Sequence, residues 1–197
     1  MKKMIEWFSS FPGMGSKSAE RIVIYILELP RNTLLKFIHD LTEMLDHVKT
    51  CIKCGNYSEK PICIMCSDDA RDRKTICIVE VPKDIALFEK SSRYNGLYHI
   101  LGGKLSPMEG VGPEDLSLVK LQKRVSEEKI KELIIATGAD LEGEATAEYI
   151  VELFKDEKNI NISRIAFGIP YGVTLDAANS VTLERALHNR VMIDKER

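Results

Sequence analysis

The sequence predicts an α/β protein that begins with a helical hairpin and carries a small cysteine-rich metal-binding finger. Three observations support this fold class. Residues 1–48 carry apolar side chains at helical spacing. Residues 51–66 contain four cysteines in two C-x-x-C pairs. From residue 75 onward, short apolar runs alternate with amphipathic segments, which is typical of crossover connections and a mostly parallel sheet with flanking helices.

The composition is that of a folded globular protein. The 197 residues are 44% hydrophobic and 29% charged. The net charge of −2 means that any contact with nucleic acid must depend on a local basic surface. We find no apolar run long enough for a transmembrane helix, and Glu6, Ser9 and Ser10 interrupt any signal-peptide pattern at the N-terminus. We therefore expect a cytoplasmic location and no membrane contact.

Four consecutive parts are expected along the chain. They are a helical domain at 1–50, a zinc finger at 51–74, an α/β domain at 75–169 and a C-terminal segment at 170–197. Within the first part, apolar periodicity predicts a helix that Pro30 ends. In the α/β domain, strands are predicted at 75–80, 98–101, 132–137 and 162–167, and helices near 114–125 and 142–155. A short helix is predicted at 180–189.

The clustered cysteines have the spacing of ligands to one metal ion. Cys51-x-x-Cys54 is followed after eight residues by Cys63-x-x-Cys66. Four thiolates suit tetrahedral Zn²⁺, and such a closed site is structural because no position is left for water or substrate. The alternative is disulfide pairing, which a reducing compartment disfavours. Cys77 lies in an apolar strand and is expected to be a small core residue.

The segment from Phe11 to Ala19 lies between two helical segments. Gly13 and Gly15 allow the backbone to turn sharply and to approach another surface closely. We expect Ser16 to cap the second helix, whose first N–H groups can bind a phosphate.

The basic residues beside this turn favour DNA contact. Lys17 and Arg21 are four residues apart, so they share one helical face and can reach a phosphate backbone. This pattern is typical of a helix-hairpin-helix, which grips DNA without reading its sequence. The alternative is an ordinary turn between helices with solvated charges.

Acidic residues follow two predicted strands. Glu80 ends the first strand, and Asp140, Glu142 and Glu144 follow the strand that ends at Thr137. The carboxyl ends of parallel strands form the binding edge of a sheet, where carboxylates can share a Mg²⁺ ion. The alternative, which the residues alone favour, is that these acids complement the dipole at a helix start.

Over essentially its whole length, the sequence resembles the RecR recombination mediators. The hairpin, the four-cysteine finger and the α/β part occur in that family's order. Three further stretches are more specific, namely Leu101–Asp115 (LGGKLSPMEGVGPED), Glu142–Thr146 (EGEAT) and Arg164–Gly172 (RIAFGIPYG).

The resemblance implies that the α/β part is a Toprim domain, the fold of topoisomerases and bacterial primases. Catalytic Toprim domains use a glutamate after the first strand and an Asp-x-Asp pair after a later one. Glu80 matches the glutamate, but Gly138 stands at the first aspartate and only Asp140 remains. We therefore expect a non-catalytic domain, as in RecR-like mediators. A weak Mg²⁺ site or a partner site at Glu80, Asp140, Glu142 and Glu144 stays an open alternative.

The resemblance also implies partners. RecR-like proteins are known as rings of four subunits around a hole wide enough for duplex DNA. With RecO and RecF they help to load RecA onto single-stranded DNA, mainly at gaps. Enclosure holds DNA even when each phosphate contact is weak, because each basic side chain appears four times. Looser candidates for DNA contact are Lys2, Lys3 and Arg31, with Lys104 facing DNA or a partner.

Some residues keep two interpretations. The apolar side chains of Ile5, Trp7, Phe8 and Phe11 suit either a core or a subunit interface. His99 is expected to be a structural hydrogen-bonding residue.

Besides the mediator, two functions remain as hypotheses. One is a metal-dependent nuclease or topoisomerase, which Gly138 and the lack of a recognisable nucleophilic tyrosine disfavour. The other is a zinc-containing adaptor without DNA contact, which the basic hairpin disfavours.

Overall fold

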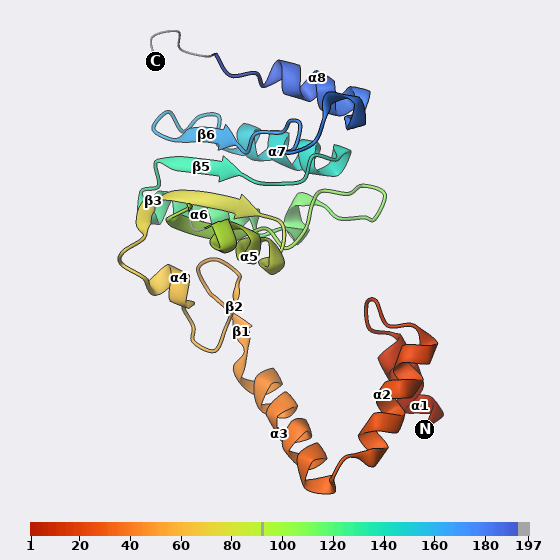
Figure 1. The fold of residues 1–197 in the computed structure, drawn as a ribbon. Helices are drawn as coiled ribbons and strands as arrows, with labels where there is room; N and C mark the ends of the chain where they lie inside the picture. The colour runs from red at the N-terminus through yellow and green to blue at the C-terminus, as the bar shows by residue number, and fades with distance from the viewer. Residues whose placement is uncertain (92, 193–197) are drawn as a thin grey trace. The chain divides into compact units, whose positions relative to one another are not determined.

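The computed structural model describes residues 1–91 and 93–192 (Figure 1). The chain forms two compact units, Met1–Val48 and Lys49–Arg197. The cysteine finger therefore folds in the same unit as the α/β part. Residues 193–197, which belong to the expected C-terminal segment, lie outside the described residues.

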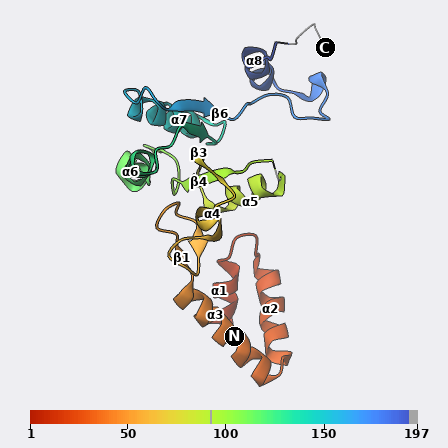
Figure 2. The same ribbon diagram turned by 90° about the vertical axis from the view of Figure 1, so that its left-hand side faces the viewer.

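The first unit consists of three helices. They are α1 (Lys2–Ser9), α2 (Ser16–Glu28) and α3 (Arg31–His47). Helices α1 and α2 lie side by side (Figures 1 and 2). Ala19 and Val23 are buried on α2, and the rings of Phe8 and Phe11 meet edge to face at 5.8 Å. The helical hairpin predicted from the sequence is thus present, and α2 ends just before Pro30 as expected.

The start of α2 differs from the expectation. Ser16 is the first helical residue, and Gly15 takes the capping position without a side-chain hydrogen bond. The cause is the extended backbone of Gly15, with φ −80° and ψ 164°, which lets the helix begin one residue earlier. The expected cap at Ser16 is therefore wrong, and the first N–H groups of α2 receive no hydrogen bond from a capping side chain.

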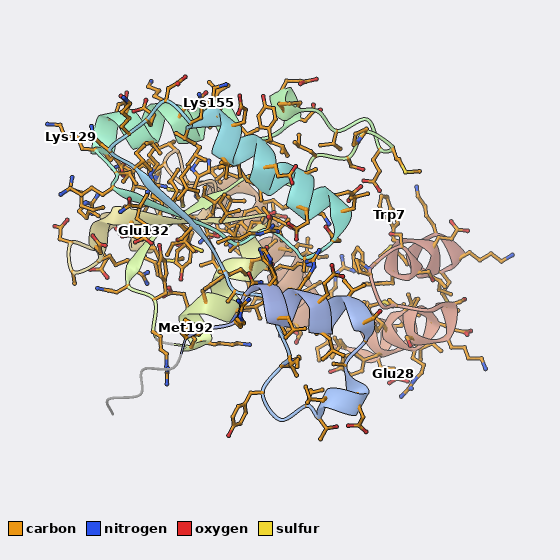
Figure 3. All side chains as sticks on the ribbon, turned by 90° about the horizontal axis from the view of Figure 1, so that it is seen from above. Trp7, Glu28, Lys129, Glu132, Lys155 and Met192 are labelled. Atoms are coloured by element: carbon orange, nitrogen blue, oxygen red, sulfur yellow. The ribbon has the colours of Figure 1, made fainter. Side chains whose placement is uncertain are left out.

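The first unit leaves many apolar side chains uncovered. All of residues 1–48 are described, and neither α1 nor α3 buries a side chain fully. Trp7 on α1 is 60% exposed, and Figure 3 labels it where it projects from that helix. Other exposed apolar residues of this unit include Phe11, Leu27, Leu35, Phe37, Ile38 and Leu45. Such a surface is unusual for a protein that works as a monomer.

The second unit opens with the cysteine finger. Strands β1 (Lys49–Thr50) and β2 (Tyr57–Ser58) pair antiparallel, and a single helical turn follows at α4 (Ile64–Ser67). These elements are too short to bury a core of apolar side chains. The residues that they bury are the four cysteines themselves.

A four-stranded parallel sheet forms the centre of the second unit, with strand order β4-β3-β5-β6. Its strands are β3 (Asp72–Val79), β4 (Gly96–Ile100), β5 (Glu132–Ile135) and β6 (Asn161–Arg164). Its helices are α5 (Pro82–Ser91), α6 (Leu118–Glu128) and α7 (Leu141–Leu153). The expected α/β fold with flanking helices is confirmed.

Two details of this part differ from the sequence prediction. Helix α5 was not predicted, because it buries only Ile85 fully and its apolar periodicity is correspondingly weak. Helix α6 begins at Leu118 rather than near residue 114. Residues Pro113–Asp115 form a separate 3-10 turn instead, in which the Gly112 N–H donates to Asp115 Oδ2 at 2.8 Å.

Alternating side chains of the strands fill two apolar layers. On one face, Ile76 and Ile78 of β3 pack with residues of α6 and α7. On the other face, Cys77 and Val79 pack with Ile85 of α5. Figure 2 shows α5 and α6 on opposite sides of the strands. Cys77 is fully buried, as expected for a core residue.

All four strands of the sheet run in the same direction, so their carboxyl ends lie together at one edge. Lys129, which follows α6, and Glu132, which begins β5, lie at the end of the unit where the strands start (Figure 3). The acidic residues lie at the other edge. Glu80 follows the carboxyl end of β3, and residues 140–144 follow the carboxyl end of β5. The chain finishes with a 3-10 turn (Leu175–Ala177) and α8 (Ser180–His188). No helix among the described residues is long and apolar enough to cross a membrane.

Candidate metal centre and nucleic-acid interface

The two C-x-x-C pairs converge on one point. The four Sγ atoms of Cys51, Cys54, Cys63 and Cys66 all lie within 4.8 Å of one another, and all four side chains are buried. Within the described residues, this is the one group of three or more His, Cys, Asp or Glu side chains close enough to share an ion. All five cysteines of the chain are free thiols. The geometry fits a metal ion, and four sulfur donors suit Zn²⁺.

Local backbone geometry aims each pair inward. After Cys51, the chain turns so that the Gly55 N–H donates to the Cys51 carbonyl at 2.9 Å. Gly55 has a φ of 81°, a left-handed conformation that favours glycine. In the second pair, Cys63 caps the short helix α4, which carries Cys66 on its first turn. The Cys63 N–H also donates to Cys51 Sγ at 3.3 Å and ties the two pairs together.

The crowded sulfur atoms need a cation when they ionise. Cys54 Sγ and Cys63 Sγ lie 3.5 Å apart in a hydrogen bond. This bond raises the pKa of the Cys54 thiol and lowers the pKa of the Cys63 thiol. A bound divalent ion would take the place of the thiol protons. Metal affinity should therefore decrease as the pH is lowered, because protons then compete for the sulfur atoms.

A buried arginine of the α/β part reaches this centre. Arg124 on α6 is 5% exposed, and its Nη2 lies 3.7 Å from Cys66 Sγ. Its Nη1 donates to the carbonyl of Tyr98 at 2.6 Å, and its Nε donates to Glu128 at 3.2 Å. The sequence prediction missed this residue. The available signal was a charged side chain on the apolar face of α6, next to the core residue Val125.

The hairpin presents its basic residues to solvent. Lys17 and Arg21 are both exposed on α2, four residues apart. The turn before them is closed by the Met14 N–H, which donates to the Phe11 carbonyl at 3.0 Å. Gly13 adopts a φ of 77° in this turn. Apart from the chain neighbours, no atom of the described residues lies within 4 Å of the position that a side chain at Gly13 or Gly15 would begin to fill. The turn is therefore open to close approach.

The other basic candidates are spread over two helices. Lys2 and Lys3 are exposed on α1, and Arg31 is exposed at the start of α3. A shallow hollow of about 370 Å³ lies on α2 and is lined by Ser18, Arg21, Ile22 and Tyr25. Arg21 thus combines an exposed position with a place at the rim of this hollow.

The acidic residues lie together at the carboxyl ends of β3 and β5. Glu80 Oε1 accepts a hydrogen bond from the Gly138 N–H at 2.6 Å. Asp140 caps helix α7, and its Oδ1 accepts from the Gly143 N–H at 2.8 Å. Glu142 and Glu144 lie in the first turn of that helix. This arrangement supports the interpretation that the acids stabilise a helix start.

Specific polar partners are also present for the second oxygen of Asp140 and for the carboxylates of Glu142 and Glu144. Asp140 Oδ2 pairs with the Lys104 ammonium at 2.6 Å, and Glu142 accepts a hydrogen bond from the Ser106 hydroxyl. Glu144 pairs with Arg164, and with Arg185 of α8 at 2.9 Å.

The arrangement does not fit the Mg²⁺ ion that a Toprim fold implies. A Mg²⁺ site needs several oxygen ligands free to point at one ion. Here Glu80, Asp140 and Glu142 are committed to the Gly138 N–H, the Lys104 ammonium and the Ser106 hydroxyl. These carboxylates are absent from the metal-binding group found among the described residues.

His99 takes a structural position. It is 1% exposed, and its Nε2 lies 3.0 Å from the Ser117 carbonyl oxygen. Burial lowers the pKa of His99 to about 4, and the charges of Arg124 and Lys120 act in the same direction. The ring is therefore neutral at neutral pH and joins β4 to the start of α6.

Comparison with known families agrees with this architecture. Residues 74–166 match the model described as "Toprim domain", and residues 1–45 match the model described as "RecR, helix-hairpin-helix". The fold and the sites thus define a Toprim-domain protein with a helix-hairpin-helix before it and a four-cysteine metal centre between the two. The second match is specific to one group of such proteins, so the chain combines a RecR-type helix-hairpin-helix with a Toprim domain.

Proposed function

We propose that this protein is a non-enzymatic recombination mediator that encloses DNA as a ring of four subunits. The RecR-type hairpin and the Toprim domain imply a role in recombination repair. In this proposed role, the protein acts in the cytoplasm with RecO and RecF to help load RecA at single-stranded gaps. Its DNA partners would be duplex, single-stranded and gapped DNA.

The observation that carries the proposal is the exposed basic face of α2 beside an open turn. Lys17 and Arg21 lie on that face, within the segment that matches the RecR helix-hairpin-helix. The glycine turn leaves room for a phosphate backbone to approach. Two cations per subunit neutralise few phosphates, so one subunit binds DNA weakly in physiological salt. Repeating them around a ring would make the same grip effective.

The uncovered apolar side chains support subunit contacts. Trp7, Phe11 and Phe37 are at least half exposed in the first unit. Aromatic residues are enriched in protein interfaces, and a patch of them is costly to leave in water. We therefore favour the interface interpretation for Trp7 and Phe11 over the core interpretation.

Retention on closed DNA tests the proposal. Purified protein is mixed with Mg²⁺ and equal masses of closed-circular and linear DNA, and retention is followed as the salt concentration rises. A clamp should stay on circles at salt concentrations that remove it from linear DNA, and should leave the circles intact. Equal loss from both forms would contradict the ring. Nicked or relaxed circles would contradict a non-enzymatic role and favour a metal-dependent nuclease or topoisomerase.

A further inference from the structure

The Lys104 side chain occupies the centre of the acidic edge. Lys104 lies in the loop after β4 and is 23% exposed. Its ammonium lies 2.6 Å from Asp140 Oδ2 and 3.6 Å from Glu142 Oε2. In this structure its charge points at two carboxylates of its own chain.

Gly138 lies beside both Glu80 and Asp140. A side chain at position 138 would begin 3.3 Å from Glu80 Oε1 and 3.3 Å from Asp140 Oδ2. A side chain placed there would begin in tight contact with both acids, which would have to shift slightly. One of these two oxygens, Asp140 Oδ2, is the atom that Lys104 holds. The ammonium therefore competes directly for a ligand atom of any ion at this edge.

The charges at this edge are already nearly balanced. The four carboxylates of Glu80, Asp140, Glu142 and Glu144 are accompanied by the three cations of Lys104, Arg164 and Arg185. The hydrogen bond to Asp140, together with the charges of Glu80, Asp140 and Glu142, raises the pKa of Lys104. The same hydrogen bond lowers the pKa of Asp140. Both partners consequently stay ionised at neutral pH.

We propose that the Lys104 ammonium serves as an internal cation in the place of a divalent metal ion and keeps such ions out of the Toprim edge. An ion entering this edge would have to displace a close charge-assisted hydrogen bond from Asp140. It would also lack the third carboxylate that Gly138 removes. Lys104 thereby stabilises the acids that remain without a bound ion. This inference does not depend on DNA binding.

Binding of Mn²⁺ to the full-length, zinc-loaded protein tests the inference. Mn²⁺ prefers oxygen ligands and ranks low in divalent affinity, so it should leave the four-sulfur centre undisturbed. Free Mn²⁺ is measured by its paramagnetic resonance signal in the absence of DNA. Replacing Lys104 by Met removes one positive charge near the acids and should tighten Mn²⁺ binding about tenfold or more. Lys123→Met is the matched control, because Lys123 pairs with Glu127 on an exposed helix face.

Further variants keep the test decisive. Lys104→Gln is used as well, since it removes the charge but keeps a hydrogen-bond donor for Asp140. Adding Gly138→Asp to either variant should tighten Mn²⁺ binding again, and adding Asp140→Asn should abolish the gain. Zinc content and melting temperature verify that each variant folds. Equal Mn²⁺ affinity in the wild type and both Lys104 variants would overturn the proposal, as would a gain that survives Asp140→Asn.

Discussion

The guanidinium of Arg124 lies 3.7 Å from the Sγ atom of Cys66, although the two residues are 58 positions apart in the chain. The contact joins the main helix of the Toprim core to the cysteine finger. A four-thiolate zinc centre carries a net charge of about −2, and a buried cation at one sulfur offsets part of it. The finger is fixed again by the Ile100 N–H, which donates to the Cys54 carbonyl at 2.8 Å. Metal binding and folding of the Toprim core should therefore be coupled.

Replacing Arg124 by Met tests this coupling. The variant keeps the apolar stem but removes the charge beside Cys66 and the hydrogen bond to the Tyr98 carbonyl. Loss of a residue that orients a metal ligand typically weakens metal affinity about 10- to 100-fold, and we expect a change of that size. Zinc affinity is measured by competition with a chelator. Lys123→Met, on the exposed side of the same helix, should bind zinc normally; an unchanged affinity in Arg124→Met would refute the coupling.

Removal of one cysteine ligand should release the metal. In Cys54→Ser, the hydroxyl cannot replace the thiolate, so zinc content should fall and the melting temperature with it. Metal analysis and thermal unfolding provide the two measurements. Cys77→Ala is the control, because Cys77 is buried in the sheet away from the finger and its loss should leave zinc content intact. Finding no zinc in the intact protein would rule out the zinc assignment.

The basic face of α2 makes a prediction about DNA retention. Replacing both Lys17 and Arg21 by Ala should abolish retention, because fewer phosphates are neutralised. Both side chains are exposed, so the free energy of unfolding should change by no more than about 0.5 kcal/mol. Lys36→Ala, an exposed substitution on α3, is the matched control. Unchanged retention in the double variant would remove the hairpin from the DNA interface.

The buried His99 predicts a pH dependence of stability. Its folded pKa of about 4 is below the ordinary value of 6.5, so the unfolded chain binds a proton more readily. Stability from neutral His99 is present above pH 6.5 and is lost as the pH falls from 6.5 towards 4. In His99→Gln this loss is absent, so the stability advantage of the wild type should shrink across that window. Urea unfolding at several pH values measures it. A constant difference between the two proteins would mean that His99 does not titrate as proposed.

Patterns local in sequence predicted most of the fold. The C-x-x-C pairs predicted the metal centre, because a chelating pair needs only a tight turn within a few residues. The four strands were predicted from short apolar runs, since burial on both faces of a parallel sheet demands them. The hairpin was predicted from its glycines and the periodicity around them. Where local signals were weak, as in α5, the prediction failed.

The sequence by itself thus predicted most of the elements and the four clustered cysteines. Only the tertiary structure decided which charges meet. Lys104 and Asp140 are 36 residues apart, and no local pattern links them. They meet because β3 pairs with both β4 and β5, which brings the loops after these strands to one edge. Arg124 likewise reaches Cys66 only after α6 packs on the sheet. Contacts between distant segments depend on this packing, and packing is a property of the whole fold.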